Sequence, residues 1–277
     1  MRKIRPLHLF LGLLIAGTAT VAAAAPDDQL SALAIFDRAL VEFERSRAAL
    51  SKWQYHQTLT THQLDETGKV VAKGTWHSIV RPGDPQPFEY ISKSVEGRIS
   101  FFEGGTNETT GEPAASPTAK GNTGTEKNQS ESAVELVRKY NLRDRYVWKR
   151  LGDETVNDES AYVLSFQPKP GQSVGSREER FFSLLGGKLW ISRDDFSVLK
   201  ARAALQSPCQ LFWIFARVTT FEMDYELRPT SGNRLFRLSR ASAKTVVKFP
   251  FVAVRQKHWQ TVDKYEPRTP RGSASSR

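Results

Sequence analysis

The sequence predicts an α+β fold, a curved antiparallel sheet with one helix at its N-terminal end and a short second helix farther along the chain. A stretch of helical period is followed by roughly ten segments of strand period, most of which are joined by short turns. Such an order is typical of a meander of neighbouring strands. The 277 residues are 39% hydrophobic, so the chain can bury a sizeable core. Its single cysteine, Cys209, excludes a disulfide framework.

The first helix is expected to follow Asp27 or Asp28, either of which can cap it, and to run to about Leu50. Apolar residues at spacings of three, four or seven form one stripe along it, namely Leu33, Phe36, Leu40, Phe43 and Leu50. Glu42 lies off this stripe together with the other charged residues. The pattern therefore predicts a helix that packs on a core with one face.

The strands are predicted from alternation and from the turns between them. Residues 65–69 form a hairpin turn and residues 81–85, rich in proline, break the chain. The expected strands are residues 53–60, 70–80, 88–95, 98–102, 145–151, 160–167, 188–192, 196–205, 211–227, 234–249 and 251–265. A capping box of Ser132 and Glu135 predicts the short helix, which ends near Tyr140.

Residues 1–24 are typical of a cleavable signal peptide. A basic head precedes the apolar stretch Leu7–Ala16, which is too short to span a bilayer, and Ala22–Ala24 supplies a cleavage site of small residues. No cysteine stands at the cut, and no later segment approaches 18 apolar residues. We therefore expect an exported, periplasmic protein with no lipid anchor and no transmembrane helix.

Residues 25–266 are expected to form a single domain. A polar segment, residues 104–130, interrupts it and contains no aromatic residue and no Val, Ile or Leu. Such a composition cannot bury enough apolar surface to offset its ordering entropy, so we expect a disordered insertion. Residues 267–277 are expected to form a loose tail.

Positive charge is concentrated near the C-terminus. Residues 228–277 contain twelve Lys and Arg against two acidic residues, in a chain whose net charge is +10. Alternation, with a turn at Pro250 that sets Lys248 opposite Phe251, places five cations on one face of the last two strands, with Arg255 opposite Lys244. They are Arg240, Lys244, Lys248, Arg255 and Lys257. Like charges across a strand pair are destabilising, so two readings remain open, a solvated basic face and a surface for an anionic partner such as an acidic membrane.

Signals for chemistry are weak. The sequence lacks a nucleophile elbow, a phosphate-binding glycine loop and a zinc-binding histidine pair on a helix. His56 and His77 could meet across a hairpin, but no third metal ligand accompanies them. Asp194 and Asp195 lie in a turn, where such residues usually bond to their own backbone. The aromatic residues do not cluster with the basic ones, as they would in a nucleic-acid binder. We expect no enzyme, no cofactor, no metal and no nucleic-acid partner.

Two motifs resemble those of a known family. The first is Gly152-Asp-Glu-Thr-Val-Asn157, followed by Ala161-Tyr-Val-Leu164 and Pro168-Lys-Pro170. The second is Gly187-Lys-Leu-Trp-Ile-Ser-Arg-Asp-Asp-Phe196, followed by Val198-Leu-Lys-Ala201. Together with the order of helix and strands, they resemble the LolA-like outer-membrane lipoprotein-sorting and carrier superfamily. The resemblance implies a half-open antiparallel barrel with helices as a lid and an apolar cavity that holds acyl chains.

The distribution of aromatic residues on the strand faces supports the same expectation of an apolar cavity. Large side chains share single faces of the predicted strands and are candidates for lining the cavity: Phe88, Tyr90, Tyr146, Trp148, Tyr162, Leu164, Phe166 and Trp190. If these faces all point inward, they enclose either a filled core or an open cavity. The predicted function is an exported, non-enzymatic binder or carrier of a lipid or lipidated protein in the bacterial envelope. The alternative is an envelope structural or sensory module that binds a protein partner through the sheet edge.

Overall fold

A computed structural model describes residues 30–84, 87–100, 133–212, 216–230 and 233–268. Ser31–Arg277 forms one compact unit. The expected signal peptide, the expected insertion and all but two residues of the expected tail lie outside the described residues. Within the described residues, no helix is both long enough and apolar enough to cross a membrane.

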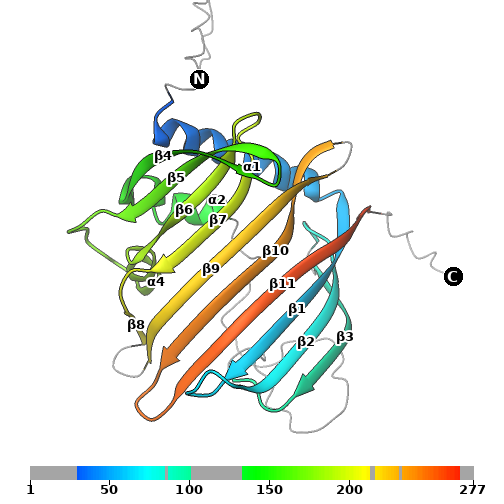
Figure 1. The fold of residues 1–277 in the computed structure, drawn as a ribbon, viewed down its shortest axis with the longest axis vertical. Coiled ribbons are helices and arrows are strands. Elements are labelled where there is room, and N and C mark those ends of the chain that lie inside the picture. The colour runs from blue at the N-terminus through cyan, green and yellow to red at the C-terminus, as the bar shows by residue number, and fades with distance from the viewer. Residues whose placement is uncertain (1–29, 85–86, 101–132, 213–215, 231–232, 269–277) are drawn as a thin grey trace, which may run out of the picture. The chain divides into compact units, whose positions relative to one another are not determined.

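One antiparallel sheet dominates this unit (Figure 1). Its strands are β1 (Trp53–Leu64), β2 (Val70–Val80), β3 (Phe88–Glu96), β4 (Tyr146–Val156), β5 (Glu159–Pro168), β6 (Leu185–Ser192), β7 (Val198–Leu205), β8 (Cys209–Phe212), β9 (Ala216–Thr230), β10 (Asn233–Lys248) and β11 (Ala253–Pro267). Their order is β3-β2-β1-β11-β10-β9-β7-β6-β5-β4, and β8 pairs with one end of β9. In the described part of the chain the sheet does not close, because β3 and β4 lie at its two ends.

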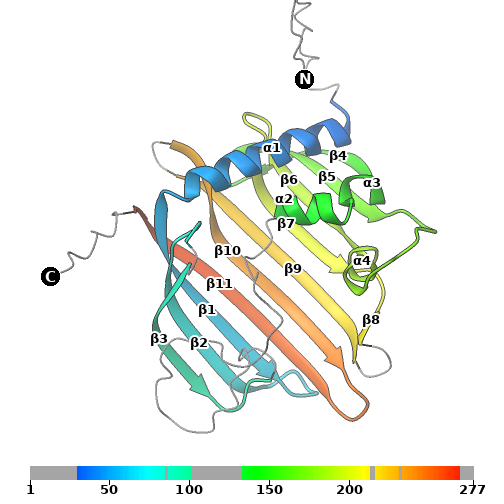
Figure 2. The same cartoon turned by 180° about the vertical axis from the view of Figure 1, so that it is seen from behind.

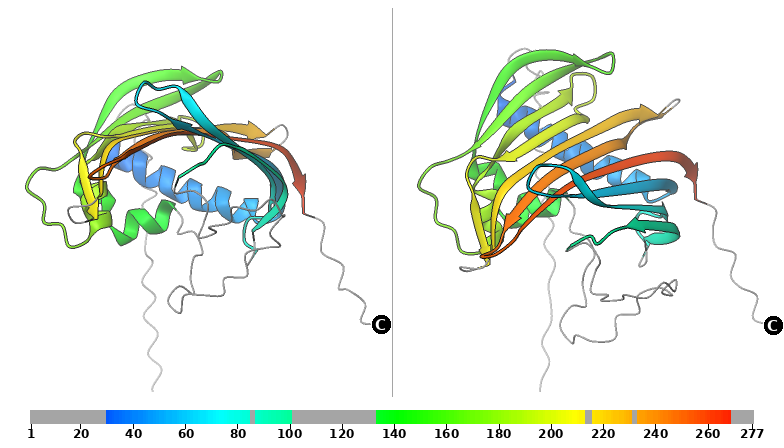
Figure 3. Two further views of the ribbon diagram at one scale, coloured as in Figure 1. Left: turned by 90° about the horizontal axis from the view of Figure 1, so that it is seen from below. Right: turned by 60° about the horizontal axis from the view of Figure 1, so that its bottom comes forward.

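The helices lie on one side of the sheet, which arches over them (Figures 2 and 3). They are α1 (Ala32–Leu50), α2 (Ala133–Lys139), α3 (Leu142–Arg145) and α4 (Arg177–Phe182). The fold class predicted from the sequence is therefore confirmed. We call the side that carries the helices the helix side and the other the outer side.

Helix α1 starts later than the sequence predicts. Its cap is Ser31, whose Oγ accepts a hydrogen bond from the Ala34 N–H at 3.2 Å, whereas Asp27 and Asp28 lie outside the described residues. The expected end at Leu50 is confirmed. Ser31 is the N-cap because its side chain accepts a hydrogen bond from an otherwise free N–H of the first turn.

The buried face of α1 also differs from the predicted stripe. It contains Glu42, which the sequence places among the solvated charges, beside Ile35, Phe36 and Ala39. A buried carboxylate is tolerated because its oxygens accept bonds from the Arg45 guanidinium at 2.8 Å and from Ser46 Oγ at 3.2 Å.

An aromatic cluster joins α1 to β4 and β5. The Phe36 ring stacks on Trp148 with a centroid distance of 4.0 Å, and Trp148 in turn packs 5.5 Å from Phe166 and 6.0 Å from Tyr146. The Tyr146 hydroxyl donates to the Phe182 carbonyl at 2.6 Å, which ties α4 to the same cluster. The core thus lies between the sheet and its helices.

Two expected strands differ from the structure, and the short helices α3 and α4 were not expected. Residues 98–100 are not a strand, although Ile99 is buried. The expected strand 211–227 is divided into the antiparallel pair β8 and β9. Helix α4 was not expected, yet Ser176 and Glu179 cap it as a capping box would, because Ser176 Oγ accepts from the Glu179 N–H at 3.0 Å.

Candidate functional site

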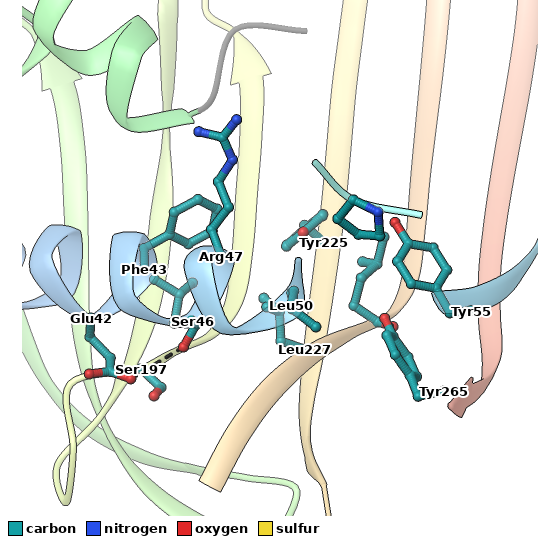
Figure 4. Close-up of a pocket in the computed structure, with 13 residues that line it drawn as sticks. Glu42, Phe43, Ser46, Arg47, Leu50, Tyr55, Ser197, Tyr225, Leu227 and Tyr265 are labelled. Atoms are coloured by element: carbon teal, nitrogen blue, oxygen red, sulfur yellow. Dashed lines mark hydrogen bonds between the residues drawn. The ribbon is translucent and has the colours of Figure 1, made fainter. Parts of the chain in front are cut away.

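A cavity of about 200 Å³ lies between the C-terminal half of α1 and the helix side of the sheet (Figure 4). We call it the α1 pocket. Its lining residues are Glu42, Phe43, Ser46, Arg47, Leu50, Tyr55, Pro82, Ser197, Val198, Tyr225, Leu227, Leu238 and Tyr265. An engineered cavity of about 150 Å³ holds benzene, so the α1 pocket has room for one slender apolar group and not for a two-chain lipid.

The wall of the pocket on the sheet is apolar and aromatic. Tyr225 and Leu227 stand two residues apart on β9 and therefore share a face. Tyr55 and Tyr265, from β1 and β11, pack with ring centroids 4.9 Å apart, and the Tyr265 hydroxyl donates to the Leu238 carbonyl at 2.8 Å. The long central strands thus bring together residues that are far apart in the sequence.

One end of the pocket is polar. Figure 4 shows Glu42, Ser46 and Ser197 at this end, and Tyr55 and Tyr265 at the other. Ser197 is 2% exposed, and its Oγ has no hydrogen-bond partner among the described residues. A buried hydroxyl without a partner costs free energy, so this atom is available to a polar group of a bound molecule.

Two tyrosines of the pocket, Tyr55 and Tyr225, stay neutral at physiological pH. Burial raises the pKa of Tyr225 to about 12, and burial likewise raises the pKa of Tyr55. Their hydroxyl groups can therefore donate hydrogen bonds without introducing charge into an apolar site.

The structure places five of the eight predicted cavity residues together on the helix side of β4 and β5. Trp148 lies directly opposite Phe166, and Tyr146, Tyr162 and Leu164 are buried beside them. The guanidinium groups of Arg150 and Arg193 lie 4.8 and 5.2 Å from the centroid of the Tyr162 ring. None of these five residues lines the α1 pocket.

The other three predicted cavity residues lie elsewhere. Trp190 pairs with Val163 and is buried in a hydrophobic cluster that includes Leu227, while its Nε1 donates to Glu154 at 2.8 Å and Lys200 lies over its ring. Phe88 and Tyr90 are exposed on the end strand β3. That these eight residues contact a ligand remains a prediction.

The predicted cations share the outer side of β10 and β11. Arg240 pairs with Glu226 at 2.9 Å and Lys244 lies 3.4 Å from Glu222. The predicted register is wrong by two residues, because Lys248 lies opposite Ala253 and Lys244 opposite Lys257. The cause is the turn, which has two central residues, Pro250 and Phe251, and is closed by a bond from the Phe249 N–H to the Val252 carbonyl at 2.8 Å.

His77 and His258 each contact a threonine of β1. His77 lies opposite Thr58 and not His56, with 3.0 Å between His77 Nδ1 and Thr58 Oγ1. His258 Nδ1 lies 2.9 Å from Thr61 Oγ1. Across the described ranges, no three His, Cys, Asp or Glu side chains are placed to hold a metal ion.

Sequence reasoning missed the α1 pocket. Tyr55 and Tyr225 stood in predicted strands, but alternation only gives the face of a strand and not its partner strand. Ser197 carried no sequence signal, since its burial depends on the turn that precedes β7, where the Ser197 N–H donates to Asp195 at 3.0 Å.

No family model and no curated protein matches this chain. Solved structures do. A LolA superfamily protein from Nitrosomonas europaea is 13% identical, with 87% of this chain and 94% of that chain covered and a TM-score of 0.30. An outer membrane lipoprotein-sorting protein domain from Vibrio parahaemolyticus is 10% identical, with 84% and 94% covered and a TM-score of 0.32. The MucA/MucB complex of Pseudomonas aeruginosa gives 11% identity, 86% and 99% coverage and a TM-score of 0.25. Each of these similarities is at low identity and at a TM-score below 0.5.

Proposed function

We propose that this chain binds one acyl chain of a lipid or lipidated protein in the α1 pocket, and that it acts as an exported binder or carrier in the bacterial envelope without catalysing a reaction. The observation that carries the proposal is the pocket itself, an apolar cavity whose polar end holds the Ser197 hydroxyl, which has no partner within the described part of the chain. Such a site fits an amphiphile, with the chain against Leu227 and the tyrosines and a carbonyl or hydroxyl group at Ser197.

The alternative, a protein partner on the sheet edge, has less support. All residues of β3 are exposed, which leaves its outer edge accessible. However, Ile91 is an extra residue in this strand, because Tyr90 and Ser92 pair with the consecutive residues Ser78 and His77 of β2. Such a bulge interrupts the ladder that an added strand would need.

A fluorescent single-chain fatty acid tests the proposal. Leu50→Trp adds a large ring where α1 meets the pocket and should weaken probe binding at least tenfold. Val41→Trp makes a similar change on an exposed face of the same helix, outside the pocket, and should leave binding within twofold. Ser197→Ala should weaken binding of the fatty acid more than binding of a pure alkane probe.

Two results would contradict this function. One is a native, folded chain that does not bind the probe, and the other is equal affinity of the parent and of Leu50→Trp. Native mass spectrometry after gentle purification separates the alternatives, since a bound lipid or lipopeptide supports the pocket and a stoichiometric protein partner supports the edge.

A further inference from the structure

The turn between β10 and β11 exposes apolar side chains at the end of a long hairpin. Phe251 has a relative exposure of 101% and Val252 of 61%, and Pro250 beside them is also exposed. At this exposure the Phe251 side chain buries no surface and contributes nothing to the core. Single exposed apolar residues are common, but here they are consecutive and lie at the tip of a projection. We call Pro250, Phe251 and Val252 the hairpin tip.

Cations surround this tip on the outer side of the sheet. Lys248 lies opposite Arg217 of β9, and neither of them, nor Lys257, has an ion-pair partner among the described residues. Arg255 lies at the long distance of 4.0 Å from an exposed Glu66. Arg217 was absent from the predicted basic set because it belongs to a different hairpin.

The cations are not arranged for the stability of the sheet. Lys244 and Lys257 are direct cross-strand partners, and a like-charged pair in this position is destabilising. A carboxylate compensates the charge of only one of the two, because Glu222 lies 3.4 Å from Lys244. The positive potential reaches β1, because burial together with Lys73 and Lys257 lowers the pKa of His62.

The spacing along the hairpin matches the layers of a bilayer surface. Lys248 lies opposite Ala253, so at about 3.3 Å per residue it is roughly 7 Å above Phe251, with Arg255 roughly 13 Å and the Lys244–Lys257 pair about 20 Å above it. Interfacial apolar side chains enter about 5–10 Å into the headgroup boundary. If Phe251 is at that depth, Lys248, Arg217 and Arg255 are level with the lipid phosphates. The Lys244–Lys257 pair then lies within about one Debye length of the phosphates.

We propose that the hairpin tip inserts into the interface of an anionic phospholipid bilayer, with Phe251 as the anchor and Lys248, Arg217 and Arg255 against the headgroup phosphates. Figures 1 and 2 show α1 across the opposite end of these strands. The α1 pocket is therefore distant from the docked tip, so membrane docking and ligand binding are separate properties. The proposal does not depend on the function of the pocket.

Vesicle binding tests it directly. The chain should start at Ala25, which keeps the compact unit Ser31–Arg277 and removes the apolar stretch Leu7–Ala16, since that stretch would itself bind bilayers. Partition constants are measured by sedimentation with vesicles of phosphatidylcholine alone and of phosphatidylcholine mixed with phosphatidylglycerol. We expect at least tenfold stronger binding to the mixture, and a loss of binding as salt shortens the Debye length from about 10 Å at 0.1 M to about 3 Å at 1 M.

Two double variants separate the anchor from the charges. Phe251→Ser with Val252→Ser should weaken binding to the mixed vesicles at least tenfold and leave the melting temperature unchanged, because neither side chain is packed. Lys248→Gln with Arg217→Gln should also weaken it at least tenfold, since each cation near an anionic surface contributes about fivefold. The matched controls are Val41→Ser on α1, and Lys149→Gln with Lys188→Gln on β4 and β6, which should bind like the parent.

A label at the tip measures insertion. Phe251→Cys can be labelled selectively with an environment-sensitive dye, because Cys209 is buried. Its emission should shift to the blue with mixed vesicles, whereas the same dye at Val41→Cys should not respond. The proposal is wrong if the parent binds both vesicle types equally, if the tip variant binds like the parent, or if the label at position 251 stays in water.

Discussion

At the scale of single residues, the burial of polar side chains on β1 and β11 could not be predicted from alternation. Thr61 is fully buried and contacts His258, and the Gln256 amide donates to Gln63 Oε1 at 3.1 Å. Thr61 and Gln63 are an even number of residues from Tyr55 on the same strand, so they share its face, the helix side of β1. A threonine or glutamine in a strand reads as solvent-facing, and its burial became visible only once the paired strand was known.

His258 makes this region sensitive to acid. Burial lowers its pKa, so below pH ~6.5 the unfolded chain binds a proton that the folded chain resists. The free energy of unfolding should therefore fall as the pH drops, by at most about 1.4 kcal/mol per pH unit, until the pH reaches the folded pKa. His258→Gln keeps a hydrogen-bonding group near Thr61 and should lose less stability between pH ~7.5 and ~5.5, measured by urea unfolding. Equal losses in both proteins would show that His258 does not titrate in this way.

Trp148 is a principal contact between α1 and the sheet. It stacks on Phe36, packs on Phe166, and its Nε1 donates to the Arg143 carbonyl at 3.0 Å. Trp148→Ala should therefore reduce the free energy of unfolding by about 3–5 kcal/mol in chemical denaturation. The neighbouring Val147 points to the other side and is exposed, so Val147→Ala should cost less than about 1 kcal/mol. A similar loss for both variants would mean that the aromatic cluster is not a principal contact of α1.

At the scale of elements, the sequence predicted strands well and their irregularities poorly. Most strands follow from alternation, and α1 and α2 from apolar spacing and a capping pattern. Helix α4 had the capping pair Ser176 and Glu179 but only six residues, too few to show a helical period. The bulges in β3 and β4 each consist of one residue, Ile91 or Leu151, and one extra residue in a strand leaves no mark in the composition.

These bulges have a consequence for association. Both end strands carry an exposed apolar residue at the bulge, and a bulge in an edge strand hinders pairing with another chain. Deleting Ile91 would make Tyr90 and Ser92 consecutive in the chain, as their partners in β2 already are, and would give β3 a regular edge. We expect this variant to associate more than the parent in analytical ultracentrifugation at equal concentration, while Ile91→Lys should not. An unchanged sedimentation profile after the deletion would show that the bulge does not limit pairing.

At the scale of the whole compact unit, strand order was the feature that the sequence could not supply. A simple meander makes sequence neighbours into sheet neighbours, but β3 and β4 lie at opposite ends of the sheet and β1 pairs with β11. Alternation gives the face of a strand, and short turns give local hairpins. Neither identifies a partner almost two hundred residues away, such as His258 for Thr61. The α1 pocket depends on this long-range pairing, because Tyr55 and Tyr265 come from the two strands concerned.

The same topology predicts how the chain depends on its last strand. In the described sheet, β1, β2 and β3 are joined to the remaining strands through β11 alone, which lies between β1 and β10. A chain that ends at Lys248 loses the ladders on both sides of β11 together with one wall of the α1 pocket. It should therefore melt without a cooperative transition by circular dichroism and should not bind the fatty-acid probe.

The matched control is a chain that ends at Arg268. It keeps β11 and the bond from the Arg268 N–H to the Lys52 carbonyl at 2.8 Å, so it should melt within a few degrees of the parent. A separately made peptide of residues 249–268 should restore part of the cooperative melting transition to the shorter chain, because it can pair as the missing strand with β1 and β10. If the chain that ends at Lys248 melts like the parent without the peptide, β1 to β3 are held by the helices and not by β11.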